Sequence, residues 1–150
     1  MAESVKHVAI AILTQCDRFL MQLRDPVPHI VHPGHWGMFG GHLDAGETPQ
    51  EAIWRELAEE ICYTPPALTL FCEDREVSVV RHVFYGELAV PIEALDLREG
   101  WDLGLLTAEQ IQAGWAHSAI AQRACPIGAP HQRLLLEFLQ HQANAVAIEP

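Results

Sequence analysis

The sequence predicts an α/β fold, and three observations lead to this prediction. Some segments are rich in β-branched residues, which favour strands, and others begin with helix-capping signals or carry apolar stripes at helical spacing. The chain has 150 residues, which is the length of one domain and enough to bury a sizeable core. We therefore expect a single domain over residues 1–150, with its core at about residues 5–142 and a frayed C-terminal tail.

The N-terminal segment is predicted to form a β-hairpin. Residues 5–13 are rich in β-branched side chains, which is typical of a buried strand, and residues 19–23 form the returning strand after a turn at residues 15–18. Residues 25–37 follow, with three prolines and two glycines. This segment is predicted to be a loop, and its length suggests a functional role.

The strongest helix signal begins at Thr48. Thr48 is a suitable N-cap, Pro49 fits the first helical position, and Glu51 completes a capping box. We expect the helix to end at Ile61 or Cys62, because the Pro pair at residues 65–66 cannot continue it.

The C-terminal half is predicted to contain strands followed by two helices. Residues 68–72 and 76–88 have strand patterns. A second cap signal at Thr107 begins a short helix, and residues 131–142 form a third helix with an apolar stripe. On one face of the second of these strands we place the side chains of Val77, Val79, Arg81, Val83 and Tyr85.

Composition and charge exclude several classes of function. Acidic residues outnumber Lys and Arg by 20 to 9, which gives a net charge of −11, whereas binding to a nucleic-acid backbone needs a basic face. No apolar run reaches the roughly 20 residues that span a bilayer. The four cysteines lack C-x-x-C spacing, which favours reduced thiols. We expect a cytoplasmic protein without nucleic-acid or membrane partners.

Acidic residues gather in and before the helix that begins at Thr48. On a helical wheel, Glu56, Glu59 and Glu60 share an arc of about 100°. Between residues 44 and 60 there are six acids and one base, Arg55. Like charges on adjacent positions repel, so this face is either solvated or offset by a divalent cation such as Mg²⁺, which prefers carboxylate and phosphate oxygens. The helix alone leaves both interpretations open.

Residues 41–63 resemble the signature of the Nudix family, G-x5-E-x7-R-E-U-x-E-E-x-G-U, in which U is a bulky apolar residue. Cys62 stands where the signature has its last Gly, and Tyr63 holds the final apolar position. The order of the predicted elements also fits, so the resemblance implies a Nudix-type α/β/α sandwich with a mixed central β-sheet. The matching positions are Gly41, Glu47, Arg55, Glu56, Leu57, Glu59 and Glu60.

The resemblance implies a Mg²⁺-dependent hydrolase, with Mn²⁺ as a possible substitute. Its substrate would be a nucleoside diphosphate linked to another group, as in nucleotide sugars, dinucleotides and nucleoside triphosphates. The resemblance also implies roles for individual residues. The metal ligands would be Glu56, Glu59, Glu60, Glu47 and the carbonyl of Gly41. The catalytic residues would be Glu56, Glu59, Glu60, Arg55 and Glu99. The substrate contacts would be Arg24, Gly40 and Gly41.

Several alternatives stay open at this point. The general base is Glu56 or Glu99, with Asp102 as a weaker candidate. A non-catalytic module that binds a nucleotide or metabolite is the alternative function, and a homodimer is an alternative to a monomer. The three histidines of the Pro-rich loop, His29, His32 and His35, have a spacing that invites a zinc interpretation, although ordinary loop polarity is favoured.

Overall fold

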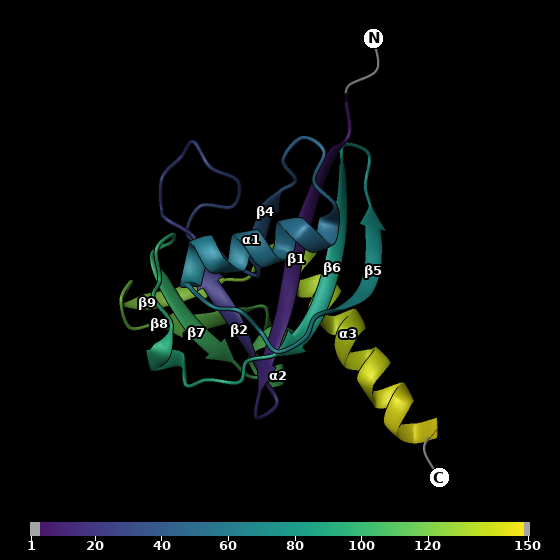
Figure 1. Ribbon diagram of the computed structural model, residues 1–150. Coiled ribbons are helices and arrows are strands. Elements are labelled where there is room, and N and C mark those ends of the chain that lie inside the picture. Colours follow the sequence, from purple (N-terminus) through teal and green to yellow (C-terminus); the bar gives the residue numbers. More distant parts are fainter. Residues whose placement is uncertain (1–3, 149–150) are drawn as a thin grey trace. The chain divides into compact units, whose positions relative to one another are not determined.

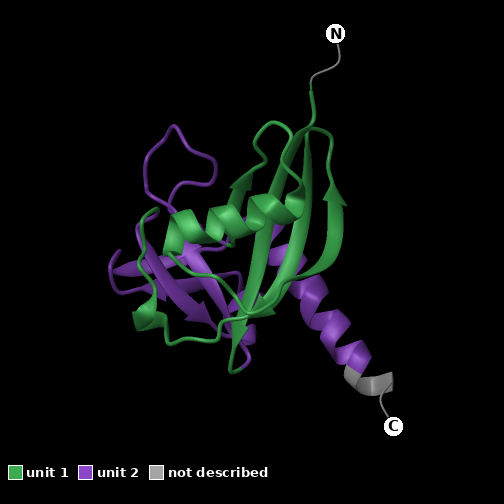
Figure 2. Cartoon of the chain, viewed as in Figure 1, with its two compact units in different colours: residues 1–16, 38–99 green, residues 17–37, 100–150 purple. Residues whose placement is uncertain are grey.

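The computed structural model describes residues 4–148 (Figure 1). Its contacts divide the chain into two compact units (Figure 2). Unit 1 consists of residues 1–16 and 38–99, and unit 2 of residues 17–37 and 100–150. Each unit is made of strands and helices, and we describe the units in turn.

Unit 1 contains a mixed β-sheet that carries one helix. Strand β1 is antiparallel to β4 and parallel to β6, and β6 is antiparallel to β5. Helix α1 packs on β4 and β1, and it crosses these strands in Figure 1. The elements are β1 (Lys6–Gln15), β4 (Phe39–His42), α1 (Pro49–Ile61), β5 (Thr69–Arg75), β6 (Val79–Glu87) and the 3-10 helix η1 (Ile92–Ala94). The predicted α/β class with a mixed sheet is confirmed.

Unit 2 combines short antiparallel strands with two helices. Strand β2 pairs in antiparallel fashion with both β3 and β7, while β8 and β9 form a separate hairpin. Helix α2 packs on α3 and β8. The elements are β2 (Arg18–Leu23), β3 (Trp36–Gly37), β7 (Asp102–Leu106), α2 (Ala108–Ala113), β8 (Trp115–Ser118), β9 (Arg123–Pro126) and α3 (Ala129–Ile148).

Both ends of α1 lie where the sequence places them. The Thr48 side chain accepts a hydrogen bond from the Glu51 N–H at 3.1 Å, and the Glu51 carboxylate accepts from the Thr48 N–H at 3.4 Å, which completes the capping box. The helix ends at Ile61 because the next residue, Cys62, takes the left-handed conformation with φ of 53°. The turn at Cys62 therefore stops the helix before the proline pair is reached.

Several boundaries differ from the prediction. Strands β1 and β2 reach into the predicted turn at residues 15–18, and β5 continues to Arg75, beyond the predicted end at residue 72. Strand β6 begins at Val79, and Val77 is fully exposed in the turn before it, so Val77 does not belong to the strand face. Helix α3 begins at Ala129 and continues to Ile148, so residues 143–148 are helical where we expected fraying. Residues 149–150 lie outside the described residues. The short strands β3, β4, β8 and β9 were not predicted, because strands of two to four residues are too short to show a periodic pattern.

Helix α1 turns one face toward the sheet of unit 1. The buried residues of this face are Ala52, Ile53, Leu57, Glu60 and Ile61. Four of them are apolar and form the core face of the helix, whereas the neighbouring Trp54 is only half-buried. Glu60 is the exception, because it is an ionisable residue on the apolar side of the helix. Its environment determines the chemistry of the candidate site.

Candidate functional site

Two glycines of β4 allow the sheet and α1 to approach each other closely. Gly40 has a φ of +146°, and a Cβ at this position would collide with the carbonyl oxygen of Ala9 in β1. A Cβ on Gly41 would lie 2.5 Å from Oε1 of Glu56 in α1. The Glu56 carboxylate therefore lies directly against the main chain of Gly41, and glycine at this position leaves room for it.

The carboxylates of Glu47, Glu56, Glu59 and Glu60 form an acidic cluster around α1. Within this cluster, Glu60 has the most strongly shifted pKa. Its side chain is 3% exposed, and Oε1 has no hydrogen-bond partner within the part of the chain that the structure describes. Burial raises the pKa of Glu60 to about 9, the neighbouring carboxylates of Glu56 and Glu99 act in the same direction, and a hydrogen bond with the Gly40 main chain opposes them. At neutral pH, Glu60 therefore holds a proton unless a positive charge comes close.

Arg55 joins the carboxylates of α1 to the preceding loop. Its Nη1 donates to Glu56 Oε1 at 3.0 Å and to Glu59 Oε2 at 3.2 Å. Its Nε and Nη2 donate to the two oxygens of Glu47 at 2.8 and 2.9 Å. The hydrogen bonds with Glu47 and Glu56 raise the pKa of Arg55 above its ordinary value. Hydrogen bonds from Arg55 and from the Asp44 main chain lower the pKa of Glu47 to about 2. The Arg55 Nε also lies 3.3 Å from Oδ2 of the exposed Asp44, so Arg55 is a permanent positive charge that pairs with four carboxylates.

The three glutamates predicted to share one arc of α1 have different environments. Glu60 is buried, the Glu56 side chain is 13% exposed, and the Glu59 side chain is 60% exposed. The carboxylates of Glu56 and Glu60 lie within hydrogen-bonding reach of each other. Glu59 is linked to Glu56 through the shared Nη1 of Arg55. The structure therefore brings two of the three together and leaves Glu59 near the surface.

Glu99 lies beside the end of α1, although it is 39 positions away from Glu60 in the sequence. The loop before it is held to the helix, since the Asp96 N–H donates to the Ile61 carbonyl and the Arg98 N–H to the Glu60 carbonyl. Glu99 itself is exposed, and its negative charge acts on the Glu60 carboxyl group. The predicted loop carboxylate is thus placed within electrostatic reach of the helix cluster.

Two further candidates belong to unit 2. Arg24 closes the loop of residues 25–35, because its main chain pairs with His35 and Gly34, and its Nε is buried without a hydrogen-bond partner among the described residues. Its assignment as a phosphate contact stays a prediction.

Asp102 accepts hydrogen bonds from the Ser118 hydroxyl at 2.7 Å and the Leu103 N–H at 2.8 Å. These bonds give Asp102 a structural task at the β8–β9 hairpin.

No three His, Cys, Asp or Glu side chains within residues 4–148 form a group that is ready to hold a metal ion. This applies to His29, His32 and His35 as well as to the acidic cluster. The cluster nevertheless supplies oxygen donors, which Mg²⁺ and Mn²⁺ prefer. The Oε1 of Glu60 also fits, because a cation would satisfy a buried oxygen that no group among the described residues satisfies.

Sequence reasoning missed the main-chain contacts of Asp96 and Arg98 and the burial of Glu60. The helical wheel contains a signal for the burial, because Glu60 lies next to the apolar arc that includes Ile53 and Leu57. The two loop contacts have no such signal, because main-chain groups are the same in every residue.

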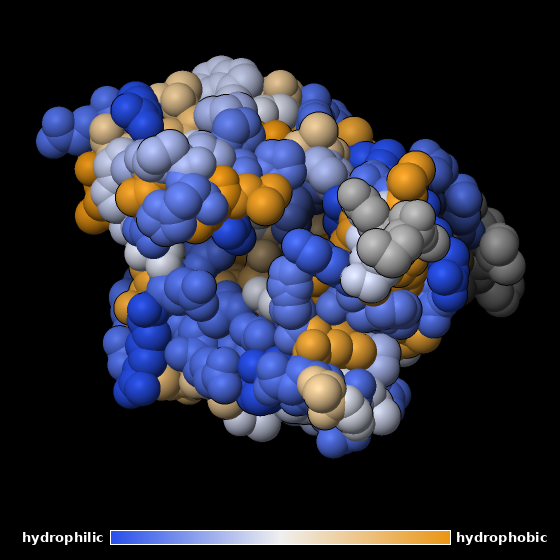
Figure 3. Space-filling view, turned by 90° about the horizontal axis from the view of Figure 1, so that it is seen from above, coloured by the Kyte–Doolittle hydropathy of each residue, from blue (hydrophilic) through white to orange (hydrophobic). Residues whose placement is uncertain are grey.

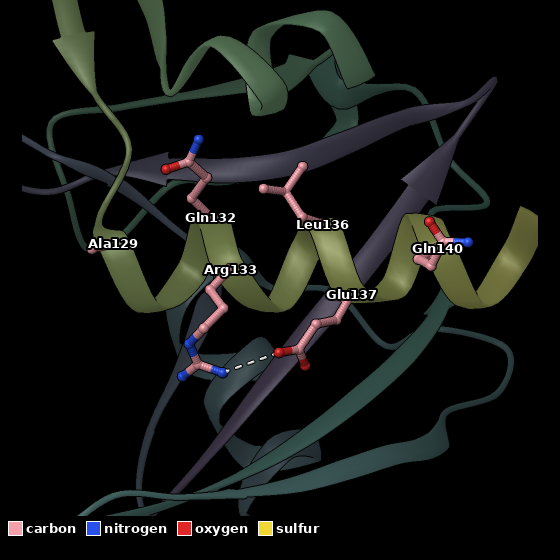
Figure 4. A pocket seen from close by; sticks show the side chains of 6 residues that line it. All are labelled: Ala129, Gln132, Arg133, Leu136, Glu137 and Gln140. Atoms are coloured by element: carbon pink, nitrogen blue, oxygen red, sulfur yellow. Dashed lines mark hydrogen bonds and ion pairs between the residues drawn. The ribbon is translucent and has the colours of Figure 1, made fainter.

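The surface outside the cluster offers a shallow pocket of about 440 Å³ on α3 (Figure 4). It is lined by Ala129, Gln132, Arg133, Leu136, Glu137 and Gln140, and Arg133 pairs with Glu137 at its edge. Figure 3 shows a largely hydrophilic face with small, separated apolar groups. None of the pocket residues belongs to the acidic cluster. No helix within residues 4–148 has the length and hydropathy needed to cross a membrane.

Comparison with known proteins identifies the family. Residues 5–120 match the model of the NUDIX domain. The chain belongs to the Nudix family. Nudix enzymes are in general pyrophosphohydrolases that act on derivatives of nucleoside diphosphates, and they generally use divalent metal ions. The prediction of a Nudix enzyme is therefore confirmed at the level of the family.

Solved structures with a similar fold are also Nudix proteins. A MutT NUDIX hydrolase from Burkholderia pseudomallei has a TM-score of 0.65 and 21% identity, with 90% of this chain and 98% of that chain covered. The NUDIX domain of Shewanella oneidensis NrtR, complexed with ADP ribose, has a TM-score of 0.66 and 17% identity, with 95% of this chain and 90% of that chain covered. A third structure is a bifunctional NMN adenylyltransferase/ADP ribose pyrophosphatase from Francisella tularensis, complexed with AMP and a Mn ion. It has a TM-score of 0.65 and 22% identity, with 93% of this chain and 42% of that chain covered. At these identities the likeness shows the Nudix fold.

Proposed function

We propose that this Nudix protein is a Mg²⁺-dependent hydrolase that cleaves the pyrophosphate bond of a nucleoside diphosphate linked to another group. The observation that carries the proposal is the buried Glu60 carboxyl group, which lies beside Glu56 with one oxygen unsatisfied. An unsatisfied buried oxygen is costly, and a divalent cation bound together with substrate phosphates would offset this cost. Mn²⁺ is proposed as a substitute, because it accepts the same oxygen ligands.

The proposed metal ligands are the three helix glutamates, with Glu47 and the Gly41 carbonyl as additional oxygens. Arg55 orients Glu56 and Glu59 through its Nη1, and it already occupies both oxygens of Glu47. When bound, the cation would neutralise charge on the pyrophosphate and make a bound water more acidic.

A carboxylate must also take the proton of the attacking water. Glu56 hydrogen-bonds to Arg55 and lies within hydrogen-bonding reach of Glu60, so its oxygens are already committed. Glu99, on the loop that follows η1, is exposed to water, and its charge acts on the Glu60 carboxyl group of α1. We therefore assign the general base to Glu99, and we assign Arg24 as a contact to the substrate phosphates.

The class of substrate is supported by two of the structural neighbours. One was solved with ADP ribose, and the other is an ADP ribose pyrophosphatase solved with AMP and a Mn ion. We therefore propose ADP-ribose as the first candidate substrate for hydrolysis assays with Mg²⁺. Nucleotide sugars, dinucleoside polyphosphates and nucleoside triphosphates are the next candidates. Release of a nucleoside monophosphate or of pyrophosphate would identify the bond that is cleaved.

The first prediction tests the two helix carboxylates that the structure brings together. Glu56→Gln and Glu60→Gln should each lower kcat by at least a hundredfold, because each removes a ligand charge, while circular dichroism should show an intact fold. Glu109→Gln is the matched control, since it removes one exposed helix carboxylate in unit 2 and should leave kcat unchanged. Near-wild-type turnover in both site variants would contradict the metal-site proposal. Tight ADP-ribose binding without turnover of any substrate would instead indicate a non-catalytic binding module.

A further inference from the structure

The loop that carries Glu99 is attached to α1 by its main chain. The Arg98 N–H donates to the Glu60 carbonyl at 2.8 Å, and the Asp96 N–H donates to the Ile61 carbonyl at 3.2 Å. Carbonyl groups in the last turn of a helix have no partner within the helix, so they are available to an incoming segment. The end of α1 therefore serves as the docking point of this loop.

The side-chain contacts of Asp96 add little to this attachment. Arg98 Nε donates to Asp96 Oδ2 at 3.2 Å, but these side chains are 62% and 64% exposed. An ion pair this exposed to solvent contributes little to stability. The thiol of Cys62 lies 3.9 Å from the same Asp96 oxygen, which is also a weak contact. The two main-chain hydrogen bonds thus attach residues 96–98 to α1.

Glu60 takes part in two interactions with this loop. Its carbonyl oxygen accepts the Arg98 N–H, and its buried carboxyl group feels the charge of Glu99, the next residue along the chain. Glu60 therefore connects the acidic cluster of α1 to Glu99. The connection consists of the hydrogen bond between the Glu60 carbonyl and the Arg98 N–H, followed by the peptide unit that joins Arg98 to Glu99. This arrangement keeps the main chain next to Glu99 close to the end of α1.

We propose that the main-chain N–H of Arg98 is a positioning group that holds the Glu99 carboxylate beside the acidic cluster of α1. The helix thereby places both the cluster and the loop base, and Glu99 needs no substrate-induced closure to reach the site. This inference rests on the proposed function, because it assigns Glu99 the role of the base. It adds the residue through which that base is preorganised.

Arg98→Pro tests the inference directly, because proline lacks the N–H. Arg98→Ala is the matched control, since it removes the same side chain and keeps the N–H. We expect Arg98→Pro to lower kcat at least tenfold, with KM and the Mg²⁺ concentration for half-maximal activity changed less than threefold. Arg98→Ala should stay within threefold of the wild type in all of these quantities. Equal kcat losses in the two variants would overturn the inference.

A double-mutant cycle distinguishes positioning from general damage. Glu99→Gln should lower kcat by about 10²–10⁴-fold, the usual contribution of a general base. If Arg98 acts through Glu99, Arg98→Pro should cause no further loss in the Glu99→Gln background. Full additivity would overturn the inference. If Glu99→Gln costs less than twofold while Glu60→Gln abolishes turnover, the positioning role fails and the proposed function stands.

Hydrogen exchange of the wild-type protein without metal gives a readout that does not depend on activity. The Arg98 amide should exchange as slowly as the amides of the last turn of α1, because the same opening event exposes both. Exchange of Arg98 at the rate of an unprotected loop amide would overturn the inference, even if Arg98→Pro fails to fold. Loss of turnover in all assays would instead refute the proposed function and leave this measurement interpretable.

Discussion

At the scale of single residues, His82 shows how neighbouring groups set the charge of a side chain. It lies in β6 and is 6% exposed, with its Nε2 3.0 Å from Nδ1 of the exposed His7. The Glu73 carboxylate of β5 lies 3.6 Å from its Nδ1. Burial lowers the pKa of His82, Glu73 opposes this effect, and His7 and Arg75 add to it. The folded protein therefore binds a proton at His82 less readily than the unfolded chain does.

This pKa shift predicts a pH dependence of stability. Because the pKa of His82 is lower in the folded state, its contribution is complete above the unfolded value of about 6.5 and is lost as the pH falls through the folded value. The difference in unfolding free energy between the wild type and His82→Gln should shrink between pH 7.5 and pH 5, as measured by urea denaturation. A constant difference for His82→Gln would contradict the shift.

At the scale of elements, the end of α1 depends on a left-handed residue that is not glycine. Cys62 has φ of 53° and ψ of 42°, and its N–H donates to the Ala58 carbonyl at 3.2 Å. A side chain makes this conformation unfavourable by about 1–2 kcal/mol, whereas glycine adopts it readily. The sequence resemblance has glycine at this position, and the structure gives the physical reason for that preference.

Replacing Cys62 by glycine should therefore stabilise the protein. The relief of the left-handed strain exceeds the extra conformational entropy of glycine in the unfolded chain, so we expect a net gain of about 0.5–1 kcal/mol. Thermal denaturation would measure it as a rise in Tm. Cys62→Ala keeps a Cβ and should give no gain. A loss of stability in Cys62→Gly would show that the weak contact between the thiol and Asp96 matters more than the strain.

At the scale of the whole molecule, charge is divided unevenly between the two units. Unit 1 has fourteen acidic residues and five Lys or Arg, whereas unit 2 has six and four. The net charge of −11 therefore resides mostly in the unit that carries the acidic cluster. Arg55 is the one base between residues 44 and 60, so the remaining carboxylates of this segment repel one another. A bound divalent cation would lower this repulsion.

Divalent cations should consequently raise the stability of the wild type. Binding to the folded state alone contributes about 2.7 kcal/mol when the cation is at 100 times its Kd. We expect Mg²⁺ or Mn²⁺ to raise Tm by several degrees, and EDTA to reverse the change. NaCl at equal ionic strength controls for general screening. The increase should be absent in Glu60→Gln and retained in Glu109→Gln; an equal increase in both would place the cation elsewhere.

Local signals explain what could be predicted from the sequence. Helix α1 is marked by neighbouring residues, since Thr48, Pro49 and Glu51 form its cap within four positions. The strands β1 and β2 are marked by composition, and the spacing of Gly41, Glu47 and the helix glutamates identifies the family. Each of these features depends on residues close together in the chain, so sequence patterns reveal them.

Tertiary structure alone decided the rest. The burial of Glu60, its contact with the Arg98 N–H and the engagement of Asp102 by Ser118 join residues that are distant in the sequence. A carboxylate has the same letter in the sequence whether it is solvated or buried, but its pKa depends on the groups packed around it. The sequence by itself therefore determined which carboxylates are available. Packing determined which of them has a raised pKa, which are paired with Arg55, and which is exposed to water.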